Sequence, residues 1–166
     1  MIVISVDVGL KGGFAILKSK IEIDAKYVMP IINGKLNFVG IDLILKCARA
    51  LADINKTKQP LVGVIEQVSA MPGQGVTSMF TFGRNYGAVE QAFFRYCDNV
   101  IYTRPKAWQA ISCKGTKGTD PKKRALEAAS NLFPKENFLA TARSKVPHQG
   151  LVDSVLIAHA GFELCK

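Results

Sequence analysis

The sequence lacks the patterns that mark zinc-binding, disulfide-rich and membrane-spanning proteins. Its 4 cysteines are widely separated and form no CxxC pair, so we expect neither a zinc site nor a disulfide framework. No apolar run reaches the roughly 20 residues that cross a bilayer, and no basic stretch precedes the first apolar run, so we expect no secretory signal. Free thiols fit a reducing compartment, which we expect to be the cytoplasm of a cell or host, or an organelle matrix.

Acidic residues are also scarce. The chain has 13 Asp and Glu against 22 Lys and Arg, which gives a formal net charge of +9. A basic surface of this kind favours a polyanionic partner, nucleic acid before an acidic membrane. Residues 104–124 hold 7 basic side chains and 1 acidic one, a net charge of +6 in 21 residues. This cluster fits phosphate binding, although a solvated lysine-rich loop would have the same composition.

The pattern of apolar residues predicts one α/β domain spanning residues 1–166. With 166 residues, of which 48% are hydrophobic, the chain is long enough to bury one core. Short β-branched or alternating runs predict strands at 2–7, 14–18, 21–29, 61–66 and 99–103. Helical spacing and capping signals predict helices at 38–56, 77–96, 105–111, 120–133 and 148–164, with loops at 30–37, 67–76, 114–119 and 134–147. We therefore predict a five-stranded mixed sheet, its first three strands antiparallel, with helices on both faces.

Three carboxylates border strongly apolar segments: Asp7 and Glu66 end predicted strands, and Asp153 lies near the start of the last helix. If the strands ending at Asp7 and Glu66 are parallel neighbours, both side chains emerge at one edge of the sheet. Three carboxylates gathered there would repel one another unless a divalent cation neutralised them. The pattern predicts a magnesium-dependent phosphoryl-transfer site. Taken singly, each residue also fits a structural role. Asp7 could cap a turn, Glu66 could form an ion pair with Arg104, and Asp153 could be a favourable charge near a helix N-terminus.

Several sequence blocks occur in the order known from one nuclease family. They are 6–9 (VDVG), 65–68 (IEQV) with 83–87 (GRNYG), 104–105 (RP) with Trp108, and 148–158 (HQGLVDSVLIA). In this order they resemble RuvC-type Holliday junction resolvases, and residues 71–80 (MPGQGVTSMF) are similar to the phage and virus-related branch of that family. The resemblance spans nearly the whole chain.

The resemblance implies an RNase H-like fold, a homodimer, and paired symmetric nicks in four-way DNA junctions, as in recombination and repair. It also implies two Mg²⁺ ions per subunit, for which Mn²⁺ could substitute. Asp7 would bridge both ions, and Glu66 and Asp153 would complete their coordination.

One position departs from the family pattern. A fourth acidic residue is expected one helical turn before Asp153, where this chain has Gln149 and Gly150, preceded by His148. Three explanations remain open: the site is weakened, His148 takes the role of ligand, or Gln149 is an inactivating substitution. The catalytic candidates are accordingly Asp7, Glu66, Asp153, His148 and Gln149.

The resemblance and the basic residues also predict two binding surfaces. The DNA-binding candidates are Met71, Arg84, Lys106, Lys114, Lys117, Lys122, Lys123 and Arg124. The dimer-interface candidates are Met79, Phe80, Gly83, Tyr86 and Gly87, to which Phe82, Val89 and Phe93 would add apolar contacts. Met71 is either a wedge between base pairs or part of the core. We expect Trp108 to lie in the core and His159 to be structural.

We carry two further functions beside junction cleavage. A protein of the same fold could bind junctions with weak or no cleavage, because the fourth acidic position is not acidic. Another RNase H-like enzyme would cleave the RNA of an RNA–DNA hybrid.

Overall fold

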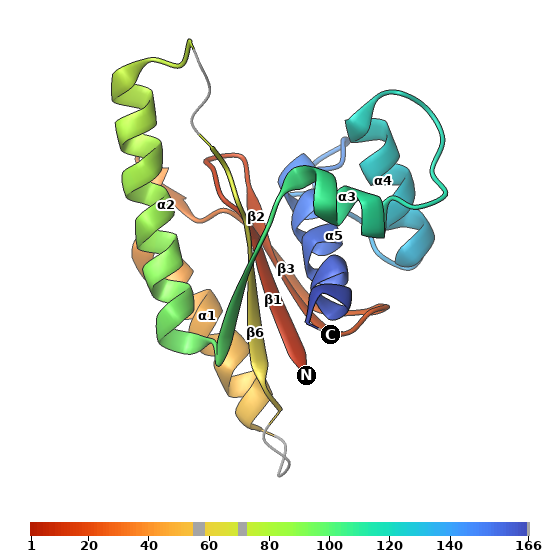
Figure 1. Ribbon diagram of the computed structural model, residues 1–166, viewed down its shortest axis with the longest axis horizontal. Helices are drawn as coiled ribbons and strands as arrows, with labels where there is room; N and C mark the ends of the chain where they lie inside the picture. Colours follow the sequence, from red (N-terminus) through yellow and green to blue (C-terminus); the bar gives the residue numbers. More distant parts are fainter. Residues whose placement is uncertain (55–58, 70–72, 166) are drawn as a thin grey trace.

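The computed structural model describes residues 1–54, 59–69 and 73–165. Its main sheet has the strand order β3-β2-β1-β6-β7 (Figure 1). The strands are β1 (Ile2–Asp7), β2 (Gly13–Ser19), β3 (Glu22–Val28), β6 (Leu61–Glu66) and β7 (Asn99–Thr103). The β1–β2 and β2–β3 pairs are antiparallel, whereas β6 runs parallel to both β1 and β7. The predicted mixed sheet with an antiparallel first half is confirmed.

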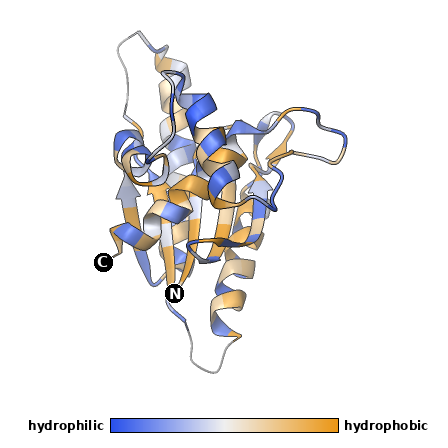
Figure 2. Ribbon diagram, turned by 90° about the vertical axis from the view of Figure 1, so that its right-hand side faces the viewer, coloured by the Kyte–Doolittle hydropathy of each residue, from blue (hydrophilic) through white to orange (hydrophobic). Residues whose placement is uncertain are grey.

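Helices cover both faces of this sheet (Figure 1). One face carries α1 (Phe38–Asp53) and α2 (Val76–Tyr96); the other carries α3 (Pro105–Ser112), α4 (Pro121–Leu132) and α5 (Gln149–Leu164). Because side chains alternate along a strand, β1 sends Ile2 and Ile4 into the core under α1 and α2, and Val3 into the core under α5. Figure 2 shows hydrophobic residues concentrated along the strands. Residues 2–6 of β1, which are apolar except for Ser5, are all buried because β1 is central.

Helix α5 is held firmly against the middle of the sheet. Nearly every residue from Gly150 to Gly161 is buried, and Ser5 Oγ of β1 donates a hydrogen bond to the Ser154 carbonyl oxygen. A methyl group on Gly161 would lie 2.7 Å from a Val64 side-chain carbon, so the absence of a side chain lets the helix approach β6. The start of α5 is therefore a fixed point relative to the ends of β1 and β6.

Two local predictions were wrong. The expected loop 30–37 contains a small hairpin of β4 (Ile31–Ile32) and β5 (Lys35–Leu36). Asn33 and Gly34 between these strands both have positive φ, 51° and 71°, as a tight type I′ hairpin turn requires. We expect Thr77 or Ser78 to cap the helix at 77–96, but α2 has Gly75 as its N-cap. We also expect Asp120 to cap the helix at 120–133. This is confirmed, because its side chain accepts hydrogen bonds from the backbone N–H groups of residues 122 and 123 at the start of α4.

None of the described helices has the length and apolar character needed to span a membrane.

Candidate active site

Asp7 and Glu66 end neighbouring parallel strands. The register pairs Val6 with Ile65, and the two carboxylates belong to the next residue of each strand. Val6 and Ile65 both point into the core under α1 and α2, so alternation directs Asp7 and Glu66 toward the opposite face, where α5 lies. Asp153 stands in the second turn of α5. The three residues predicted from sequence therefore come to one edge of the sheet.

The electrostatics of these carboxylates reflect their proximity. The pKa of Asp7 is raised to about 7, first by burial and then by the negative charges of Glu66 and Asp153. The pKa of Asp153 is raised to about 6, mainly by burial and also by the charge of Glu66. The pKa of Glu66 is raised by burial as well. A bound cation would offset the repulsion among these negative charges.

Two neutral donors hold two of the carboxylates. Trp108 Nε1 donates a hydrogen bond of 2.7 Å to Glu66 Oε1, and Gln149 Nε2 donates one of 2.8 Å to Asp153 Oδ1. Each bond lowers the pKa of the carboxylate that accepts it. No described residue donates a hydrogen bond to the Asp7 carboxylate, in keeping with its pKa of about 7. Trp108 lies in the core as predicted, with 2% exposure, but its contact with Glu66 was not foreseen.

The first turn of α5 packs directly on the backbone of the β1–β2 turn. A Cβ on Gly150 would lie 2.6 Å from Gly12 Cα and would meet the Lys11 carbonyl oxygen, so no side chain fits there. A Cβ on Gly12 would in turn meet the carbonyl oxygen of Asp7. This contact, which we call the glycine contact, fixes Asp153 relative to Asp7. It also excludes a fourth carboxylate at position 150, which leaves Gln149 as the residue one turn before Asp153.

Two buried polar atoms near this edge have no partner in the part of the chain that the structure describes. They are Thr103 Oγ1 and His148 Nδ1. Thr103 ends β7 and pairs in register with Glu66, and its side chain is 3% exposed. His148 is the N-cap of α5, and its backbone N–H bonds to the Phe138 carbonyl oxygen. An unpaired buried polar atom costs free energy unless something else satisfies it.

The donor set fits a hard divalent cation in its chemistry. Carboxylate and hydroxyl oxygens are the ligands that Mg²⁺ prefers, and a cation would relieve the repulsion that raises the pKa of Asp7. Across residues 1–54, 59–69 and 73–165, however, no group of three or more His, Cys, Asp and Glu side chains is gathered closely enough to hold a metal ion. Glu66 and Asp153 each accept a hydrogen bond from a neutral donor, Trp108 and Gln149.

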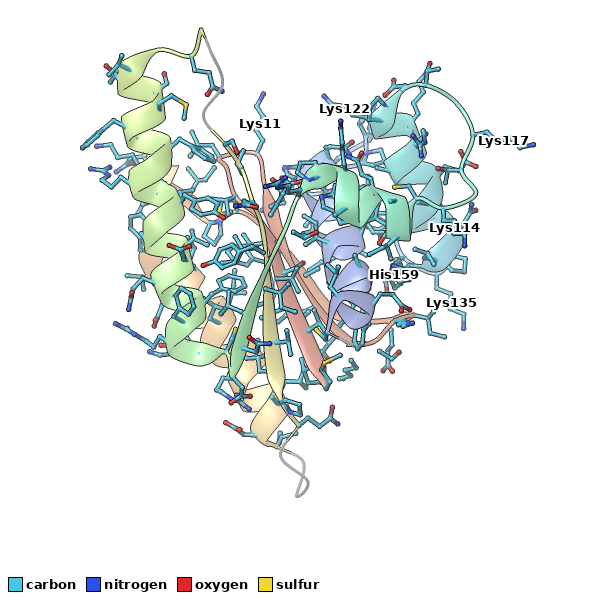
Figure 3. All side chains as sticks on the ribbon, in the orientation of Figure 1. Lys11, Lys114, Lys117, Lys122, Lys135 and His159 are labelled. Atoms are coloured by element: carbon cyan, nitrogen blue, oxygen red, sulfur yellow. The ribbon has the colours of Figure 1, made fainter. Side chains whose placement is uncertain are left out.

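The basic residues predicted to bind DNA do not all lie at this edge. Lys122, in the first turn of α4, is close enough to Asp153 to lower its pKa. Figure 3 shows Lys122 and Lys11 pointing out from the same end of the sheet, whereas Lys114 and Lys117 lie toward the outer side of the α3–α4 connection. Lys11 was missed in the sequence, although it stands in the glycine-rich turn that follows Asp7.

The remaining DNA-binding candidates have varied surroundings. Lys106 lines a groove of about 390 Å³ with Arg104 and Gln67, just beyond the end of β6. Lys123 and Arg84 are exposed, and Arg124 is half-buried with Nε bonded to a threonine hydroxyl. Met71 lies outside the described residues.

Helix α2 carries an outward stripe of apolar and small residues. Phe80 is 73% exposed, and a Cβ on Gly83 or Gly87 would meet nothing within 4 Å. Met79 and Tyr86 are half-buried, and the Tyr86 hydroxyl donates to the Glu66 backbone carbonyl oxygen at 3.3 Å. The expectation that Val89 and Phe93 add to a dimer interface was wrong. Both are fully buried in the chain's own core, because they lie on the face of α2 that packs on the sheet.

The chain resembles known proteins in structure rather than in sequence. No family model matches the sequence, and no curated protein matches it. Two solved structures of RuvC from Thermus thermophilus do match. One, in complex with a Holliday junction substrate, has a TM-score of 0.60 and 13% identity over 96% of this chain and 91% of that one. The other has a TM-score of 0.58 and 17% identity over 96% and 92% of the two chains. The chain thus has the RuvC fold, which confirms the RNase H-like architecture predicted from its sequence blocks.

Proposed function

We propose that this protein is a metal-dependent endonuclease that resolves four-way DNA junctions. One observation carries the proposal: Asp7, Glu66 and Asp153 lie at the same edge of the sheet, in a chain that has the RuvC fold. The matching RuvC structure contains a Holliday junction substrate. The net charge of +9 supports a nucleic-acid substrate.

The chemistry assigned to the site is hydrolysis of a phosphodiester bond. Asp7, Glu66 and Asp153 would hold two Mg²⁺ ions, which would activate a water molecule and stabilise the leaving 3′ oxygen. Trp108 and Gln149 orient the carboxylates of Glu66 and Asp153 through the hydrogen bonds described above. We assign the backbone phosphates of the strand to be cut to Lys122 and Lys11, which point out from the same end of the sheet.

A homodimer would present two such sites to a two-fold junction. The outward stripe of α2, with Phe80, Gly83 and Gly87, is the surface we assign to the partner. Exposed glycines on one face allow two helix backbones to approach closely, and the adjoining phenylalanine would bury apolar area on association.

A second candidate is a junction-binding protein with weak or no cleavage. It is favoured by Gln149, which brings an uncharged amide to Asp153 at the position where a fourth carboxylate was expected. Such a protein would keep the phosphate contacts but would bind divalent cations less tightly.

The deciding experiment presents the protein with a labelled four-way junction, a duplex of the same sequence and an RNA–DNA hybrid, with Mg²⁺, with Mn²⁺ and with neither. Paired symmetric nicks in the junction alone support the resolvase. Tight junction binding without product, even in Mn²⁺, supports the second candidate. Cleavage of the hybrid overturns both. Asp7→Asn is the matched variant, because it keeps the volume of the side chain while removing its charge; we expect it to bind the junction and leave it uncut.

A further inference from the structure

A cavity of about 360 Å³ opens on the α2 side of the strand end that carries Asp7, whose carboxylate points toward the α5 side. One wall is formed by residues 8–10, which directly follow Asp7, and the other by α2, which contributes Thr77, Thr81, Phe82 and Asn85. A ligand in this cavity would lie next to the strand end that carries Asp7. The volume falls in the range of cavities that bind small organic groups.

The chemistry of this cavity differs from that of a phosphate site. No charged side chain of the described part of the chain lines it. By contrast, the groove beyond the end of β6 is lined by Arg104 and Lys106. Phosphates of a nucleic acid are held by cations and backbone N–H groups, whereas bases are held by neutral hydrogen-bonding groups and by aromatic rings. The two grooves at this end of the sheet therefore suit two different parts of a nucleotide.

The polar groups of the cavity are available to a ligand. Within the described residues, the side chains of Thr81 and Asn85 form no hydrogen bond, and Asn85 is half-buried. An asparagine amide offers both a donor and an acceptor, which is the pairing that reads the edge of a base. Phe82, whose ring lies 6.1 Å from that of Tyr86, adds aromatic surface to the same wall.

We propose that this cavity binds a single unpaired nucleobase next to the scissile phosphate, with Asn85 and Thr81 bonding to its edge and Phe82 in contact with its ring. The proposal rests on the proposed function and deepens it. A base at the crossover of a junction is more easily withdrawn from its stack than one inside a duplex. The cavity would thereby contribute to the choice of branched over duplex DNA and to any sequence preference at the cut.

The test is a set of junctions in which one nucleotide at a time around the crossover is abasic. For the wild-type protein we expect one abasic position to weaken junction binding about tenfold, as loss of a stacked and hydrogen-bonded base does. Asn85→Ala and Thr81→Val should weaken binding to the intact junction, by about tenfold for Asn85→Ala, and should lose the sensitivity to that abasic position. Gln91→Ala, an exposed α2 residue outside the cavity, is the control and should behave like the wild type. Thermal unfolding of each variant checks that it is folded.

The outcomes separate this inference from the function on which it rests. If the wild type prefers junctions but no abasic position weakens its binding, the base-binding cavity is overturned and the junction function stands. The same conclusion follows if the abasic position weakens the binding of Asn85→Ala as much as it weakens that of the wild type. If the wild type shows no preference for a junction over a duplex, both fall.

Discussion

The indole N–H of Trp108 and the carboxylate of Glu66, 42 residues apart in the chain, form a hydrogen bond of 2.7 Å. It joins helix α3 to the carboxyl end of β6. Burial raises the pKa of Glu66, and the indole lowers it. Trp108 therefore favours the ionised form of Glu66, which is the form that binds a cation, and limits the rotation of its side chain.

We predict that Trp108→Phe weakens metal binding more than it weakens the fold. A hydrogen bond to a charged group contributes about 1.5–3 kcal/mol, so the Mg²⁺ concentration for half-maximal cleavage should rise about tenfold or more. The control is Tyr86→Phe, which removes a hydroxyl that bonds to the Glu66 backbone rather than to its carboxylate. Mg²⁺ titrations of both variants check the prediction, and equal shifts in the two would contradict a role for the indole.

Gln149→Asp should raise cleavage at limiting Mg²⁺. The new carboxylate would stand one turn before Asp153, where the amide of Gln149 now bonds to it, and would strengthen the attraction for a divalent cation. Without metal the same change adds repulsion and should lower stability by about 1 kcal/mol. Gln149→Asn, which shortens the side chain without charge, separates charge from geometry. Unchanged or lower activity in Gln149→Asp would remove this residue from the site.

Stability should depend on pH through Asp7. Its pKa rises from 3.8 in the unfolded reference to about 7 in the folded protein, so between these values the folded state binds more protons than the unfolded chain. The contribution of Asp7 to the free energy of unfolding therefore decreases as pH rises through this range. Asp153, with a pKa of about 6, acts in the same direction.

Asp7→Asn removes this pH-dependent penalty. Without divalent cations it should be more stable than the wild type by about 1–3 kcal/mol at pH 8, and the difference should largely vanish at pH 4. Mg²⁺ should raise the unfolding temperature of the wild type at pH 8 and have little effect on the variant. Urea unfolding at both pH values, with and without Mg²⁺, is the measurement. A variant less stable than the wild type at pH 8 would show that Asp7 has mainly a structural role.

Lys122 and Lys135 should differ in their effect on DNA affinity. Lys122 points out beside the carboxylates, whereas Lys135 lies away from that end of the sheet (Figure 3). Loss of a lysine that contacts a phosphate reduces the slope of log affinity against log salt by about one. We expect this for Lys122→Gln and no change for Lys135→Gln, in junction binding measured from low to moderate salt. The same slope for both variants would indicate a diffuse charge effect.

The exposed glycines of α2 offer a test of the homodimer. A methyl group at Gly83 or Gly87 meets nothing in the chain itself, and alanine favours a helix over glycine by about 1 kcal/mol. Gly83→Ala and Gly87→Ala should therefore stabilise the isolated chain while weakening self-association at least several-fold. Analytical ultracentrifugation gives the association constant. Association that is unchanged or stronger would place the partner's contact elsewhere.

The sheet and its carboxylates were predictable because their signals are local. An apolar run that ends in Asp7 or Glu66 is visible in a few consecutive residues, and parallel pairing of the strands brings their ends together. The β4–β5 hairpin also has a local signal, Asn33-Gly34, but its flanking strands are only two residues long, too short for an alternating pattern.

The rest of the site was not predictable because it depends on contacts between distant residues. The burial of Trp108 was expected from its size, but nothing near it in the chain indicates that Glu66 accepts its N–H. Helical spacing likewise divides α2 into faces without deciding which of two apolar faces packs on the sheet. Val89 and Phe93 therefore seemed as suitable for a dimer interface as Phe80, until the fold placed them inside.

The glycine contact between residues 12 and 150 joins the two ends of the chain through backbone atoms alone. The spatial relationship of Asp7 to Asp153 thus does not depend on the long stretch of polypeptide between them. Insertions into the surface loops of that stretch would leave the relationship intact. This arrangement would let a lineage of such proteins remodel its substrate-facing loops while the reacting groups keep their places.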